Sequence, residues 1–160
     1  MHRSRRATFA MLAFFPVIAL NGVVAEKADF TGTWVLNAMK SKNMGFIAAL
    51  QATATIKQTD TFLVMDETSA LMGQERTRQV RYELTGKTLP NEGSQGEKAE
   101  TVSVWLDDKL VTTWTTEGAN PGTRVTRTET RYLSDDGKSM VVESKRDTSP
   151  PVVMVFDRKH

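Results

Sequence analysis

Short stretches in which apolar and polar residues alternate occur along most of this chain. Between Gln79 and Leu84, for example, Val80 and Tyr82 are each flanked by polar residues. An alternation of period two places apolar side chains on one face of a β-strand and polar side chains on the other. Turn-forming residues separate these stretches, and no long helical period interrupts them. The pattern predicts about nine strands: Phe30–Leu36, Ala52–Gln58, Thr61–Thr68, Arg76–Leu84, Thr101–Leu106, Leu110–Thr116, Thr123–Leu133, Met140–Lys145 and Val152–Phe156.

Short strands joined by tight turns predict an all-β fold, and we expect an antiparallel up-and-down barrel of about 8–10 strands. The strand pattern alone does not distinguish a closed barrel from a flattened β-sandwich. Polar loops are expected at Pro90–Gly96 and Gly118–Gly122. The segment Asn37–Gln51 differs, because Phe46, Ile47 and other apolar residues lie there among helix-forming residues. We expect a short helical segment, which acts either as a mobile lid over a cavity or as an ordinary packed connection.

The alternation also predicts which side chains point into the barrel. Trp105 has the opposite parity to the valines beside it and is expected at the surface or rim. The interior is either a ligand pocket or a core filled by these side chains. The candidate ligand-binding residues are Trp34, Val80, Tyr82, Val104, Trp114, Tyr132, Met154 and Phe156, and Leu84, Val102, Leu106 and Val152 share the expected inward faces.

The N-terminus has the pattern of a secretory signal. Three arginines (Arg3, Arg5 and Arg6) precede an apolar run at 10–20, and small residues suited to signal peptidase end at Ala25. The run is shorter than the roughly 20 apolar residues of a membrane-spanning helix. We therefore expect a signal peptide at residues 1–25 and a single domain at 26–160, which is periplasmic or secreted and not membrane-spanning after cleavage. Export by the Sec or the twin-arginine route fits these arginines.

Cleavage changes the net charge. The whole chain has 21 basic and 19 acidic residues, and loss of three arginines leaves 18 basic residues and a net charge of −1 in place of +2. The remaining arginines alternate with glutamates and form no basic stripe, so we expect no nucleic-acid binding. We expect solvated strand faces to carry Arg76, Arg78, Arg81, Arg124, Arg127 and Arg131.

Residue types used in catalysis and metal binding are scarce. The chain has no cysteine, and its two histidines are His2, within the signal, and His160, the final residue. These counts exclude disulfides, thiolate metal sites and histidine catalysis in the body of the mature chain. The paired carboxylates at 107–108 and 135–136 fall in expected turns, where they stay solvated. We therefore expect no enzyme activity, no metal site and no cofactor.

Four motifs occur in a characteristic order. The sequence D-F-T-G-T-W-V-L-N at 29–37 is followed by K-S-K at 40–42, Y-E-L-T-G-K at 82–87 and W-L-D-D-K-L at 105–110. Together they resemble exported bacterial lipocalin-like proteins of the calycin superfamily, many of which have no assigned function. The resemblance covers most of residues 28–158 and implies a β-barrel in which Trp34 closes one end.

Two departures from related barrels bear on the ligand. Lipocalins usually add a helix after the barrel, which is not expected here. Cytosolic fatty-acid-binding proteins hold a ligand carboxylate with an Arg-x-Tyr pair on the final strand, where this chain has Met154–Phe156. We therefore expect a barrel that binds or carries a small, uncharged or bulky apolar molecule. The alternative is a protein-interaction or structural module of the cell envelope with a packed, ligand-free barrel and an envelope protein as its partner.

Overall fold

The computed structural model describes residues 26–147 and 149–159, so the expected signal peptide lies outside the described residues. This part of the chain forms strands and one 3-10 turn, η1 (Gly45–Ala49). Within it, no helix has the length and apolar character needed to cross a bilayer. The strands are β1 (Gly32–Leu36), β2 (Gln51–Gln58), β3 (Phe62–Leu71), β4 (Gln74–Glu83), β5 (Leu89–Glu92), β6 (Lys98–Leu106), β7 (Lys109–Glu117), β8 (Arg124–Leu133), β9 (Ser139–Lys145) and β10 (Val152–Arg158).

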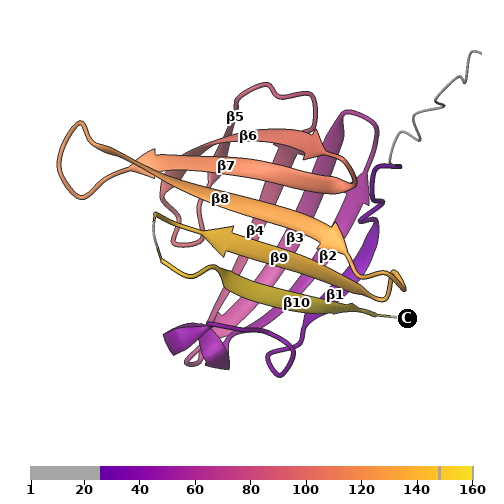
Figure 1. Cartoon of the computed structure of the whole chain (residues 1–160). Helices are drawn as coiled ribbons and strands as arrows, with labels where there is room; N and C mark the ends of the chain where they lie inside the picture. The colour runs from indigo at the N-terminus through magenta and orange to yellow at the C-terminus, as the bar shows by residue number, and fades with distance from the viewer. Residues whose placement is uncertain (1–25, 148, 160) are drawn as a thin grey trace, which may run out of the picture.

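The ten strands form one antiparallel sheet in the order β4-β3-β2-β1-β10-β9-β8-β7-β6-β5. The first and last strands of the chain are neighbours, with Trp34 paired with Arg158. This pairing curls the sheet into a barrel, in which a front layer around β6–β10 crosses a rear layer around β1–β4 (Figure 1). The predicted all-β, up-and-down barrel is confirmed, as is the short helical segment after the first strand.

The barrel is closed by side chains at one seam, between β4 and β5, which are the two ends of the sheet order. The Asn91 side chain accepts a hydrogen bond from the Arg81 backbone N–H (3.1 Å) and donates one to the Arg81 carbonyl (2.7 Å). Arg76 also pairs with Glu92 across this seam (2.7 Å). The Asn91 amide therefore bridges the two edge strands at Arg81, where no backbone ladder joins them.

Two predictions about the strands were wrong. One concerned the location of β5, and the other concerned which face of β6 points inward. The expected loop at Pro90–Gly96 overlaps β5, whose four-residue sequence, Leu-Pro-Asn-Glu, is too short to show an alternation. On β6 the inward side chains are those of Thr101, Ser103 and Trp105, and Trp105 stacks on Phe30 with ring centroids 6.0 Å apart. The valines of β6 face outward because the interior at this strand is built from small hydroxyl side chains.

The G-T-W motif closes one end of the barrel. Trp34 is fully buried, and its indole N–H donates to the Phe30 carbonyl (2.8 Å). The Arg158 guanidinium lies 4.2 Å from the centre of the Trp34 ring. Gly32 has φ +138°, and a Cβ there would lie 2.8 Å from the Arg158 side chain. The motif therefore needs glycine for its backbone conformation, and a larger residue would also displace the end of the Arg158 side chain.

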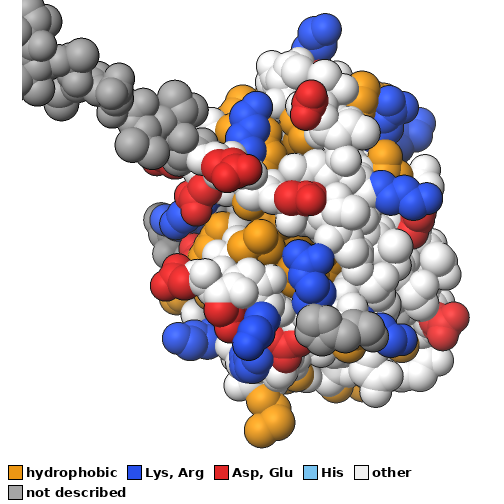
Figure 2. Space-filling view, turned by 90° about the vertical axis from the view of Figure 1, so that its right-hand side faces the viewer, with side chains coloured by type: hydrophobic (Ala, Val, Ile, Leu, Met, Phe, Trp, Pro, Cys, Tyr) orange, Lys and Arg blue, Asp and Glu red, His pale blue; other side chains and the backbone are white. Residues whose placement is uncertain are grey.

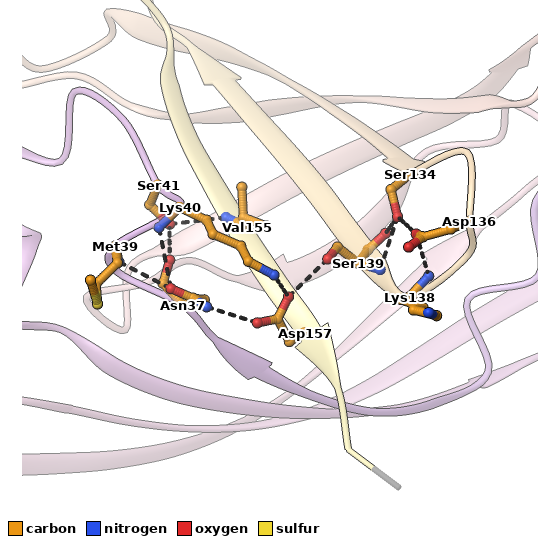
Figure 3. A network of polar contacts seen from close by, with 10 residues as sticks. All are labelled: Asn37, Met39, Lys40, Ser41, Ser134, Asp136, Lys138, Ser139, Val155 and Asp157. Carbon is orange, nitrogen blue, oxygen red and sulfur yellow. Dashed lines mark hydrogen bonds and ion pairs between the residues drawn. The ribbon is translucent and has the colours of Figure 1, made fainter.

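A polar network ties the segment after β1 to the last strand (Figure 3). The Asp157 carboxylate pairs with Lys40 (2.8 Å) and accepts hydrogen bonds from Asn37 (2.7 Å) and Ser139 (2.8 Å). These three donors hold the pKa of Asp157 at about 2, below its usual 3.8. The network therefore fastens β10 to both of its neighbouring segments.

We expect stability to fall between about pH 4 and pH 2, because Asp157 has a lower pKa in the folded chain and its contribution is lost as it is protonated. The side chain is 38% exposed, so screening limits its contribution to roughly 1 kcal/mol. Asp157→Asn should lose this amount at pH 7 and show a flatter dependence below pH 4. Urea unfolding of both proteins across this range checks it, and parallel pH curves would contradict the assignment.

Candidate functional site

A cavity of about 1270 Å³ opens at one end of the barrel. Its walls come from η1, the turn between β3 and β4, the first half of β8, and the chain around the start of β10. Pockets that hold small ligands commonly measure roughly 300–1,000 Å³. This end of the barrel is therefore not filled by its own side chains.

Exposed apolar side chains lie at the mouth of this cavity, among exposed polar residues such as Glu75 and Arg146. Phe46 on η1 is 83% exposed and Met72 on the β3–β4 turn is 89% exposed, although both line the opening. Met72 has φ +52°, a left-handed conformation that is unfavourable for a side chain of this size. Ile47 and Leu50 continue the same apolar rim inward. Exposed apolar side chains at an opening fit the passage of an apolar molecule.

The inner wall, in contrast, carries charges. The Arg78 guanidinium pairs with Glu67 through Nη2 (2.8 Å), and both side chains are largely buried. Arg127 and Glu129 of β8 form the facing part of the wall. Among the described residues, Arg127 forms no ion pair. The cavity thus runs from a mouth with exposed apolar side chains to a charged interior.

Behind this wall lies a second buried ion pair. Arg131 is 4% exposed and donates from Nη2 to Glu129 (2.8 Å) and to the Tyr82 hydroxyl (3.3 Å). Burial lowers the pKa of Arg131, but Tyr82 and Glu129 raise it by more, so the guanidinium stays charged. Burial raises the pKa of Tyr82 to about 12, so its phenol is neutral at pH 7. Edge-on contact joins Tyr82 to Trp114, with ring centroids 5.9 Å apart.

These positions correct the expectation that the arginines lie on solvated strand faces. Arg81 and Arg124 fit that expectation, since both are exposed, whereas Arg76 is half-buried and lines the cavity. Arg78, Arg127 and Arg131 instead face the interior. On β8 the odd-numbered residues point inward, so the threonines and Tyr132 on the even positions point outward.

The eight candidate ligand-binding residues fall into three places. Met154 lines the cavity. Val104 and Tyr132 lie on the outer face, where Tyr132 bonds Glu143 (2.6 Å), so their predicted inward orientation was wrong. Val102 and Leu106 share the outer face of β6, and Val152 lines the cavity. The remaining candidates are buried in the core beside or beyond the cavity: Trp34, Val80, Tyr82, Trp114 and Phe156, together with Leu84.

The segment between β1 and β2 forms part of the cavity mouth. Its Met44 is buried, whereas Phe46 projects into solvent. The Asn43 side chain donates to the Pro151 carbonyl (2.9 Å), which attaches the segment to the start of β10. The segment between β1 and β2 is therefore part of the wall of the opening, and one side of it is attached to the start of β10.

The described residues offer no group of three potential metal ligands. The paired carboxylates lie in turns, where Asp136 accepts hydrogen bonds from the Ser134 hydroxyl and the Lys138 N–H that lower its pKa. On the face shown in Figure 2, basic and acidic side chains are mixed around small hydrophobic patches. That face therefore carries no large patch of a single charge.

No protein-family model matches the chain, and no curated protein matches it in sequence. Solved structures do match. The fluorescent protein UnaG has a TM-score of 0.63 at 19% identity, over 81% of this chain and 97% of its own. Lipid binding protein 8 of Caenorhabditis elegans has 0.63 at 13%, over 81% and 95%. The REP1-NXSQ fatty acid transporter has 0.62 at 14%, over 81% and 96%. These similarities show a calycin-like barrel fold.

Proposed function

We propose that this protein binds a small, mainly apolar molecule inside its barrel and carries or sequesters it. The observation that supports the proposal best is the cavity of about 1270 Å³ with exposed apolar side chains at its mouth. Two of the structural neighbours are named as lipid-binding or fatty-acid-transporting proteins. Binding of an apolar molecule requires no metal site, and the described residues contain no group of three potential metal ligands.

We also propose that the protein works in the periplasm or outside the cell. The support is the N-terminal pattern of arginines, an apolar run and small residues ending at Ala25. N-terminal sequencing of the protein recovered from fractionated cells and medium tests this. A mature N-terminus at Glu26 agrees with the proposal, whereas intact Met1 in the cytosolic fraction contradicts it.

Filling the cavity should weaken ligand binding. Ser69 lines the cavity and its neighbour Thr68 faces outward on the same strand, so Ser69→Trp and Thr68→Trp form a matched pair. We expect the neutral probe N-phenyl-1-naphthylamine to give a saturable fluorescence increase with wild type and Thr68→Trp. Ser69→Trp should weaken binding about tenfold or more, because the indole occupies the space that the probe needs. Equal binding to both variants would place the probe outside the barrel.

A further inference from the structure

Four buried side-chain nitrogen atoms on β7 and β8 have no hydrogen-bond acceptor in the described chain. They are Nε of Arg127, Nε and Nη1 of Arg131, and Nε1 of Trp114. Each is a donor only, so each needs an acceptor that the protein does not supply. Leaving buried donors unsatisfied is costly, and bound groups commonly complete such sites.

These donors belong to one cluster. Arg127 and Trp114 are paired across β7 and β8, and the guanidinium carbon lies 5.1 Å from the centre of the indole ring. Trp114 contacts Tyr82, and the Arg131 guanidinium carbon lies 4.9 Å from the centre of the Tyr82 ring. Arg127 forms part of the cavity wall. A molecule in the cavity therefore reaches the cluster through Arg127.

The cluster also has an excess of positive charge. Glu67 is paired with Arg78 and Glu129 is paired with Arg131, so both acidic groups of the inner wall already have partners. Arg127 is the third guanidinium and has no carboxylate within ion-pair distance among the described residues. A charge held in a partly buried site of low dielectric favours a counter-charge of opposite sign. The missing group is therefore both an acceptor and an anion.

We propose that the cavity binds an amphipathic molecule whose anionic head group docks on Arg127, with the buried donors of Arg131 and Trp114 behind it. The apolar part of the molecule extends past Met154 toward Ile47 and the mouth. This proposal rests on the proposed function and names the class of ligand. Carboxylate and phosphate monoester share the required chemistry, since both present several acceptor oxygens and no donor when fully ionised. The head group lies on β8 and not on the final strand, where Met154 and Phe156 offer no charge.

Ligands of equal chain length and different head group test the proposal. Decanoic acid, decyl phosphate and 1-decanol are each titrated against N-phenyl-1-naphthylamine bound to the wild-type protein at pH 7. We expect at least one anion to bind about tenfold or more tightly than the alcohol, because a charge-assisted hydrogen bond in a shielded site discriminates by that factor. The preferred anion identifies the head group.

Two variants locate the head group. Arg127→Gln removes the unpaired guanidinium, and Arg146→Gln removes an equal charge from an exposed position on the cavity rim. We expect Arg127→Gln to bring the anion down to the affinity of the alcohol, and Arg146→Gln to keep the wild-type ratio. If Arg127→Gln does not fold, Arg127→Lys is used in its place. The ratio of anion affinity to alcohol affinity should then be intermediate, because lysine keeps the positive charge and lacks the several donors of a guanidinium group.

Equal affinity of the alcohol and both anions for the wild type would overturn the head-group assignment and leave the proposed function intact. An anion preference that survives Arg127→Gln in the folded protein would also overturn it. Loss of the preference in Arg146→Gln would then place the responsible charge at the rim. Failure of the neutral probe and of 1-decanol to bind would instead remove the proposed function itself.

Discussion

Glu129→Gln is expected to lower the free energy of unfolding by about 3 kcal/mol. Glu129 is the carboxylate partner of Arg131, and both side chains are largely withdrawn from solvent. Glutamine keeps the shape of the side chain but leaves the Arg131 guanidinium charged, buried and without a counter-charge. The removal of one partner from a buried ion pair is much more damaging than the removal of an exposed one. Urea denaturation followed by circular dichroism measures the loss.

Two further variants separate charge from packing at this pair. Glu92→Gln breaks the exposed pair with Arg76 and should cost less than about 1 kcal/mol. The double variant Glu129→Met with Arg131→Met replaces both buried charges by apolar side chains and should recover most of the loss. If Glu129→Gln costs no more than Glu92→Gln, Glu129 does not compensate the buried charge.

Trp34→Ala is expected to destabilise the barrel by about 4 kcal/mol, since it removes a fully buried indole and leaves a cavity. It also removes the hydrogen bond to the Phe30 carbonyl and the ring beneath the Arg158 guanidinium. Because small domains have a total stability of roughly 5–15 kcal/mol, this is a large fraction. Circular dichroism in urea is the suitable measurement, because the change removes a fluorophore.

Trp34→Phe provides the control for aromatic packing. It keeps an aromatic ring in the same space and should cost about 1–2 kcal/mol, from the lost hydrogen bond and the smaller ring. Val35→Ala on the same strand alters a 40% exposed side chain and should change little. A cost of Trp34→Ala as small as that of Val35→Ala would mean that this end of the barrel does not depend on the indole.

The architecture could be predicted because it depends on strand periodicity and turn chemistry, both of which are local. The G-T-W motif also fixed the position of the first strand, since Gly32 and Trp34 have specific backbone and packing roles. The short strand β5 could not be seen, because Pro90 and its polar neighbours suit a strand only at the edge of a sheet.

The candidate site was predicted poorly for a physical reason. Placing apolar residues inward assumes that the interior of the barrel is apolar. Here Ser103 forms a hydrogen bond with Thr112 inside the barrel (2.8 Å), while Val104 faces solvent. On β8 the same rule turned Tyr132 inward and Arg131 outward, and the structure has the reverse. Alternation identifies two faces of a strand without saying which one is inside, so a barrel with a charged interior reverses the assignment.

Because β1 and β10 are neighbours, folding of the barrel requires contacts between residues that are far apart in the sequence. Asn37 and Asp157, which bond each other, are separated by 120 residues in the sequence. Contacts between such distant positions are slow to form, because a long loop must first close, and topologies dominated by them fold in milliseconds to seconds. The barrel cannot close until β10 has been synthesised and can pair with β1.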